Sequence, residues 1–207
     1  MNGSVTARDL EQAQPVPEPE YKHTGAFLEM LISSAIGLVA SLVLSIEAVT
    51  LAANPDAVLA CDISAKISCG AVGVSWQSEV LGFPNAFLGL IAEAVVITVA
   101  VAALGGVKFP RWFMLAAQCV YAIGFVFAYW LFWQSFSVIG ALCPWCLLIT
   151  VTTTLVFFSL TRINILDGNF GAGVQRKLTP ALRVGADVAV SVILIAIIAA
   201  MVIVGYI

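Results

Sequence analysis

Long apolar runs, separated by short polar segments, dominate the chain. Three of these runs have about the 20 residues that a transmembrane helix needs, and they cover about 27–50, 85–104 and 188–207. A fourth run, residues 112–161, contains no charged residue over its whole length. As a single helix it would be roughly 75 Å long, whereas the hydrocarbon layer of a membrane is only ~30 Å thick.

The fourth run must therefore fold into two spans that are joined by a tight turn. Small and polar residues lie near its middle, namely Gln134, Ser135, Ser137 and Gly140. The pattern predicts five transmembrane helices and hence an all-α integral membrane protein. Because five is an odd number, we expect the two ends of the chain on opposite sides of the membrane.

The basic residues orient these helices. Eight of the nine fall before the first span, between the second and third, or between the fourth and fifth: Arg8, Lys22, Lys108, Arg111, Arg162, Arg176, Lys177 and Arg183. These three segments lie on one side of the membrane, and Lys and Arg favour the cytoplasmic side. We therefore expect a cytoplasmic N-terminus and an extracytoplasmic C-terminus.

Composition narrows the function classes. Hydrophobic residues make up 61% of the chain and charged residues 10%, whereas soluble proteins carry about 25% charged residues. Nine Lys and Arg against twelve Asp and Glu leave no basic face for nucleic acid. A single His leaves little for a His-built metal site or a Ser-His-Asp triad. The five cysteines are therefore the only chemically distinctive residues and the candidates for a functional site.

Four of the five cysteines fall on the predicted outer side, where disulfides form and persist. Cys61 and Cys69 lie in the loop after the first span, and Cys143 and Cys146 follow the predicted turn. Two structural disulfides, or a zinc site built from four thiolates, are alternatives to a redox site. Cys119 lies inside the third span, and we expect it to pack in the core as a small hydrophobe.

The segment Cys143-Pro144-Trp145-Cys146 favours redox chemistry, because this spacing is the one used for thiol–disulfide exchange. Proline is preferred at the first position of a helix, so Cys143 is predicted to cap the fourth helix. The positive end of a helix dipole lowers the pKa of a thiol that lies there. The same position lies at the membrane surface, within reach of a quinone dissolved in the bilayer. The sequence thus predicts a redox site without a metal.

Three further features concern the surroundings of the cysteines. Residues 71–84 are apolar and aromatic and predict a short interfacial helix over the site, supported by Ser75, or a plain linker. Asp62 and Lys66 are expected on a solvated face of the loop. Glu93 is an acid inside the second span, and it either relays protons or hydrogen-bonds a neighbouring helix.

Together, these residues resemble the vitamin K epoxide reductase family. The resemblance rests on the outer pair Cys61 and Cys69 with the intervening sequence, on Ser75-Trp76, on the spacing from Asn85 to Gly89, and on the Cys-x-x-Cys that opens the fourth span. It covers about residues 27–162, and it is specific because both cysteine pairs and the Asn appear in the right order.

The resemblance assigns residues 26–162 to a four-helix catalytic core with an outer loop (51–84). Composition and the predicted spans assign the rest of the chain to a disordered cytosolic tail (1–25), a cytosolic loop (163–187) and a fifth transmembrane helix (188–207). The fifth helix is typical of bacterial members, so we expect a bacterial inner membrane. Many of those members carry a fused thioredoxin-like domain. Here we expect a separate redox partner instead.

The resemblance also implies an activity. A DsbA-like thioredoxin-fold protein outside the cytoplasm would pass electrons to Cys61 and Cys69, then to Cys143 and Cys146, and finally to a membrane quinone. Asn85, Ser75 and Cys146 would bind the quinone. Such a relay supports disulfide bond formation outside the cytoplasm. The overall likeness to actinobacterial members favours menaquinone over ubiquinone.

One departure from the family concerns the substrate. The animal enzymes have a Tyr about one helical turn beyond the Cys-x-x-Cys, whereas this chain has Leu147-Leu148-Ile149-Thr150 there. The sequence therefore favours simple quinone reduction over epoxide reduction. Two alternatives stay open. One is a DsbB-type quinone reductase, in which the two cysteine pairs occur in the opposite order. The other is a non-enzymatic transporter or assembly protein with two structural disulfides.

Overall fold

The computed structural model describes residues 23–206. Within that range it contains five long helices: α2 (Thr24–Ala53), α4 (Ala86–Leu104), α5 (Arg111–Gln134), α6 (Pro144–Leu166) and α8 (Ala186–Tyr206). Each is long and apolar enough to cross a membrane. The predicted all-α membrane fold with five spans is confirmed. The predicted disordered tail falls almost entirely on residues 1–22, outside the described part of the chain.

The turn between α5 and α6 lies where the sequence predicts it. The last turn of α5 widens into the π-helical segment η2 (Ser135–Ile139), and Gly140 then adopts φ 72°. Glycine reaches this left-handed region at no steric cost. Ser135 holds the turn closed by donating its hydroxyl proton to the carbonyl of Ala141 at 2.5 Å. The charge-free run is thereby folded back on itself.

Helices α2, α4, α5 and α6 form a bundle in which α2 packs on α4 and α6, and α5 packs on α6. Its largest apolar cluster contains Met30, Met114, Val156 and Leu160 among its members. Many hydroxyl side chains are also buried, mainly on α2 and α6: Ser33, Ser34, Ser41, Ser45, Thr150, Thr152, Thr153 and Thr154. Small side chains allow membrane helices to approach closely, which explains their place in the interior.

The segment predicted as a cytosolic loop contains a helix that the sequence analysis did not expect. This helix, α7 (Ala172–Arg183), connects α6 to α8. The Arg162 guanidinium fixes the start of α8 by donating to both carboxylate oxygens of Asp187, at 2.9 and 2.8 Å. The far end of α8 is attached through Tyr206, whose hydroxyl donates to the carbonyl of Phe136 at 3.2 Å.

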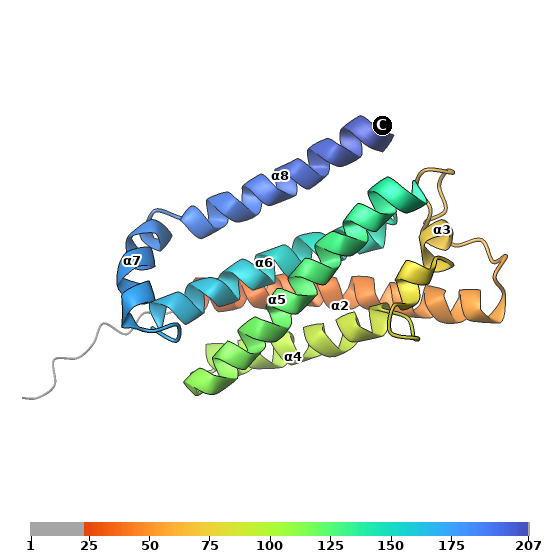
Figure 1. Cartoon of the computed structure of the whole chain (residues 1–207). Coiled ribbons are helices and arrows are strands. Elements are labelled where there is room, and N and C mark those ends of the chain that lie inside the picture. Colours follow the sequence, from red (N-terminus) through yellow and green to blue (C-terminus); the bar gives the residue numbers. More distant parts are fainter. Residues whose placement is uncertain (1–22, 207) are drawn as a thin grey trace, which may run out of the picture.

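The two ends of the bundle differ in character (Figure 1). At one end, α7 and the start of α2 surround a hollow whose lining includes Lys108, Arg176 and Arg183. At the other end lie the short helix α3 (Cys69–Gly73), the end of α2 and the C-terminal end of α8. The cluster of basic residues and the cysteine loop are thus separated along the length of the bundle.

Candidate functional site

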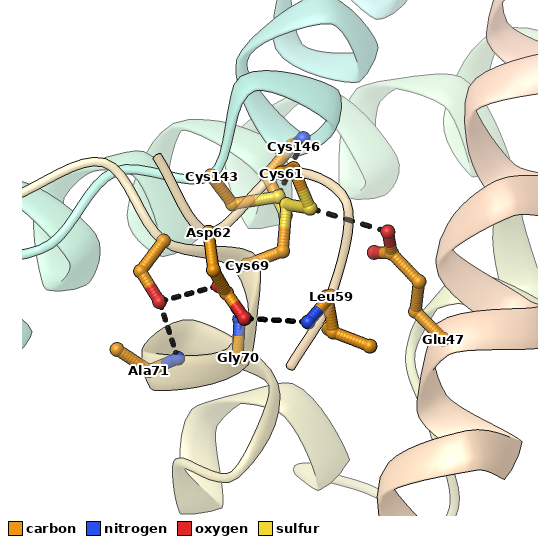
Figure 2. Close-up of a disulfide and its surroundings, with 10 residues drawn as sticks. Glu47, Leu59, Cys61, Asp62, Cys69, Gly70, Ala71, Cys143 and Cys146 are labelled. Carbon is orange, nitrogen blue, oxygen red and sulfur yellow. Dashed lines mark hydrogen bonds between the residues drawn. A yellow bond between two sulfur atoms is a disulfide. The ribbon is translucent and has the colours of Figure 1, made fainter. Parts of the chain in front are cut away.

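The structure brings the four predicted site cysteines together at one end of the bundle (Figure 2). Cys61 and Cys69 form a disulfide with their Cα atoms 5.6 Å apart. Cys143 and Cys146 are free thiols. All four belong to one apolar cluster. Since two of the sulfurs are joined, the arrangement lacks the four thiolates that a zinc site of this kind requires.

Two backbone hydrogen bonds hold the cysteine pairs next to each other. The Ser68 amide donates to the carbonyl of Leu142 at 3.0 Å, and the Leu142 amide donates to the carbonyl of Lys66 at 2.9 Å. Cys69 directly follows Ser68, and Cys143 directly follows Leu142. The two loops are therefore paired one residue before their reactive sulfurs. Sequence reasoning missed this pairing, because a single bridge between two loops has no periodic pattern.

One cysteine of each pair lies at the start of a helix. Cys69 is the first residue of α3, and its N-cap Ser68 accepts a hydrogen bond from the Ala71 amide at 3.0 Å. Cys143 is the N-cap of α6, as the Pro144 that follows it predicts. Its Sγ accepts a hydrogen bond from the Cys146 amide at 3.3 Å. The Cys143 sulfur thus lies near the positive end of the dipole of α6, a helix of 23 residues, whereas α3 has only five.

These hydrogen bonds favour the thiolate of Cys143. The Cys146 side chain contributes most, and the amides of Cys146 and Trp145 add to it. Together they lower the pKa of the Cys143 thiol despite its burial, which alone would raise the pKa. Cys143 is therefore a good leaving group when a disulfide to it is broken, because a low-pKa thiol leaves faster.

Asp62 shapes the loop between the two disulfide-bonded cysteines. One carboxylate oxygen accepts hydrogen bonds from the Gly70 amide at 2.9 Å and the Ser68 hydroxyl at 2.7 Å, and the other accepts from the Leu59 amide at 2.8 Å. These bonds, above all the one from Gly70, lower the pKa of Asp62. The expectation that Asp62 only faces solvent is wrong, because the loop's own donors surround it.

The second half of the outer loop forms two short helical segments instead of one interfacial helix. After α3 comes the 3-10 helix η1 (Trp76–Glu79). Ser75 connects them, and its hydroxyl donates to the carbonyl of Val72 at 2.6 Å. The ring of Trp76 lies next to that of Trp130 on α5, with centroids 6.1 Å apart. Ser75 therefore helps to set the shape of the loop over the bundle.

Asn85 lies at the N-cap position of α4 and is tied to the same loop. Its side-chain amide donates to the carbonyl of Gln77 at 2.6 Å. Its Oδ1 atom is buried and has no hydrogen-bond partner among the described residues. An amide has a second N–H as well, so Asn85 retains one donor and one acceptor for a polar ligand. The spare N–H can donate to a carbonyl group, and the Oδ1 atom can accept from a hydroxyl group.

Glu47 is a residue that sequence reasoning did not connect with the cysteines. It lies on α2, and its Oε1 atom is 3.2 Å from the Sγ of Cys61 (Figure 2). Its Oε2 atom is buried and has no hydrogen-bond partner among the described residues. The only signal in the sequence is an acid near the end of an apolar span, where a charged side chain ordinarily reaches the membrane interface.

Two other singled-out residues lie apart from this cluster. Glu93 is buried in the bundle and accepts a hydrogen bond from the Tyr121 hydroxyl at 3.1 Å. Of the two expectations for Glu93, the structure shows the bond to a neighbouring helix, and the proton relay stays a prediction. Cys119 is exposed on α5. The expectation that it packs in the core is wrong, because that face of α5 points away from the bundle.

Comparison with known proteins gives one family match. The model of the vitamin K epoxide reductase family matches residues 28–161. No curated protein matches the chain. The matched range contains α4, α5, the outer loop and all four clustered cysteines, together with nearly all of α2 and most of α6.

Proposed function

The chain belongs to the vitamin K epoxide reductase family, and from that premise we propose that it oxidises a thioredoxin-fold partner and passes the electrons to a quinone. Members of this family are membrane thiol oxidoreductases. The observation that carries the proposal is the cluster itself. A disulfide and two free thiols share one buried apolar site, although Cys143 lies 74 positions after Cys69 in the sequence.

The first half of the proposed relay takes electrons from the partner. A thiolate of the partner attacks Cys61, forms a mixed disulfide and releases Cys69. The partner's second thiol then attacks the mixed disulfide. The partner leaves with its two cysteines joined in a disulfide, and Cys61 is left as a thiol. Val58 and Ile63 support docking of a partner here, since these apolar side chains flank Cys61 and are 87% and 72% exposed. We propose a DsbA-like protein for this role.

The second half of the relay is a transfer within the chain. Cys69 attacks Cys143 of a Cys143–Cys146 disulfide and releases Cys146 as a thiolate. The backbone pairing at Leu142 supports this transfer, because it holds the two sulfur pairs side by side. Figure 2 shows the side chain of Cys143 pointing towards the Cys61–Cys69 disulfide.

The final acceptor in the proposal is a quinone, and we favour menaquinone. When bound, a quinone takes up the electron pair that two thiols release on forming a disulfide, together with two protons. Asn85 would hold its carbonyl oxygen through the spare amide N–H. Ser75 helps to keep the outer loop folded, and in this proposal the apolar residues of that loop would cover the bound quinone.

We propose that the cysteine end of the bundle faces the outside of a bacterial inner membrane. The grouping of Lys108, Arg176 and Arg183 at the opposite end supports this orientation. Oxidising conditions on the outer side would allow the relay to serve disulfide formation in exported proteins.

The test is dithiol oxidation by the full chain in detergent, with a soluble menaquinone analogue as acceptor and a reduced thioredoxin-fold protein as donor. Loss of quinone absorbance measures the rate. We expect Cys146→Ala to abolish quinone reduction and Cys119→Ala to leave it unchanged. Full activity of Cys146→Ala would refute the proposal. A purely structural role of the cysteines would instead show as a lower melting temperature without any quinone-dependent turnover.

A further inference from the structure

The carboxyl group of Glu47 is built into the wall of the cysteine cluster. Leu44 and Leu51, three residues before it and four after it on α2, both pack in that cluster. Residues with this spacing share one face of a helix. Glu47 therefore lies on the stripe of α2 that contacts the disulfide. Its Oε1 is 3.2 Å from Cys61 Sγ. When Cys61 is reduced, this contact can become a hydrogen bond from thiol to carboxylate.

The surroundings of Glu47 do not explain its presence structurally. The titratable groups that face it are the sulfurs of the cluster, from the outer loop and α6, and the carboxylate of Asp62. The ion pairs found among residues 23–206 involve other acids, Asp167 and Asp187. Within this described range Glu47 has an unpaired oxygen and forms no ion pair, and half-burying such a carboxyl costs stability. A role in the chemistry of Cys61 would explain why the site contains it.

We propose that Glu47 is a catalytic residue that accepts the proton of the Cys61 thiol when Cys61 re-forms its disulfide with Cys69. This inference rests on the proposed relay. The step begins with Cys69 joined to Cys143 and with Cys61 as a thiol. Glu47 Oε1 takes the proton as the Cys61 sulfur attacks Cys69. The Cys61–Cys69 bond forms, the Cys69–Cys143 bond breaks, and the electron pair leaves on Cys143 as a thiolate.

The redox balance of this step closes within the chain. Cys61 and Cys69 are oxidised to a disulfide, and Cys143 is reduced. The oxidant is the Cys69–Cys143 mixed disulfide, which derives from the Cys143–Cys146 disulfide that the quinone regenerates. The structure shows the products of the step, namely a Cys61–Cys69 disulfide and free thiols at Cys143 and Cys146.

The charge balance explains why a carboxylate suits the position. Before the step one negative charge lies on Glu47, and after the step one negative charge lies on Cys143. This step therefore adds no charge to the apolar cluster, where an additional charge would be costly. The hydrogen bonds at the start of α6 stabilise the charge where it arrives. In the next cycle Cys61 leaves as a thiolate when the partner is released, and protonated Glu47 then returns its proton to Cys61.

The experiment compares Glu47→Gln with Glu79→Gln, which removes an exposed carboxylate of the same outer loop. Both are measured in the quinone-dependent assay between pH 5 and 9. Samples quenched with acid during turnover are alkylated and analysed by mass spectrometry for the Cys69–Cys143 mixed disulfide. We expect Glu47→Gln to slow turnover roughly 100-fold at neutral pH and to accumulate this mixed disulfide, and Glu79→Gln to do neither.

The pH profile separates this role from a structural one. In Glu47→Gln the rate should keep rising up to the ordinary thiol pKa of about 8.5, because Cys61 must then ionise unaided. Glu47→Asp retains a carboxylate with a shorter reach and should recover part of the rate. If Glu47→Gln fails to form the resting Cys61–Cys69 disulfide, the turnover rate and the amount of mixed disulfide in Glu47→Asp test the role of Glu47 instead.

The inference would be overturned if a folded Glu47 variant turned over at the natural rate and accumulated no Cys69–Cys143 mixed disulfide. The relay itself would stand in that case, provided that Cys146→Ala is inactive. Full activity of Cys146→Ala would instead remove the relay and the role of Glu47 with it. The two failures are therefore distinguishable.

Discussion

Single side chains around the disulfide perform separable tasks. Asp62 organises the loop, and Glu47 touches the reacting sulfur. Both are acids, but their surroundings differ. Asp62 accepts three hydrogen bonds, whereas one oxygen of Glu47 has no partner among the described residues. Hydrogen bonds to a carboxylate favour its charged form, so Asp62 takes up a proton only at a lower pH than a carboxylate with fewer such bonds.

Replacing Asp62 by Asn should loosen the loop that holds the disulfide. Asn has an NH2 group in place of one carboxylate oxygen. If its remaining oxygen keeps the bonds from Gly70 and Ser68, the Leu59 amide loses its acceptor. We expect the Cys61–Cys69 disulfide to be reduced roughly tenfold faster by a phosphine. The measurement is the rate of thiol appearance, with Glu79→Asn as the control. Equal rates for Asp62→Asn and the natural chain would contradict this assignment.

Acid should also loosen the outer loop of the natural chain, because it protonates Asp62. The folded pKa of Asp62 is lowered, so its stabilisation is complete above the unfolded value of about 3.9 and is lost as the pH falls through the folded value. We expect the loop to stay ordered near neutral pH and to open below about pH 4. Reduction by the phosphine should accelerate in that range in the natural chain and not in Asp62→Asn.

At the scale of elements, the decisive contact is the backbone pairing between the outer loop and Leu142, two residues before α6. Leu142 both donates to Lys66 and accepts from Ser68. Proline at position 142 would remove the donor, whereas alanine would keep it. We expect Leu142→Pro to slow oxidation of the partner at least tenfold more than Leu142→Ala does. The yield of the Cys69–Cys143 mixed disulfide measures the contact directly, and equal yields would contradict its role.

Hydropathy predicts the long helices well, because lipid requires an apolar surface wherever a helix crosses it. Pro144 likewise predicts the start of α6 and the capping position of Cys143. Helix α7 escaped prediction because its polar and basic residues have the composition of a loop. The Leu142 pairing and the contact of Glu47 with Cys61 depend on how separate segments meet in space. A local sequence pattern does not predict such contacts between segments that are distant in the sequence.

At the scale of the whole molecule, the bundle has apolar side chains outside and hydroxyl groups inside. Ile46 and Ile123 are exposed on the outside, whereas Ser34 and Thr154 are fully buried. This distribution suits a protein whose solvent is lipid. The low share of charged residues predicted the lipid environment, since 10% cannot cover a water-exposed surface of this size, but it did not predict the buried hydroxyl groups.

The orientation of the molecule can be tested in intact cells. After mild reduction, a membrane-impermeant thiol reagent should label Cys61 or Cys69, because we expect the outer loop to face the medium. Cys119 should stay unlabelled, since it is exposed on an apolar span. Mass spectrometry of the purified chain identifies the labelled positions. Labelling of the loop only after cell lysis would place the cysteines on the cytoplasmic side.

The bridge at Leu142 also bears on how the protein behaves when it is scarce. Two sulfur pairs on one rigid frame meet at an effective concentration that dilution of the protein cannot change. Transfer between them is therefore a first-order event in every molecule. Only the encounters with partner and quinone depend on the concentrations of those two molecules. The rate of transfer within each copy of the chain is therefore the same whether the cell holds few copies or many.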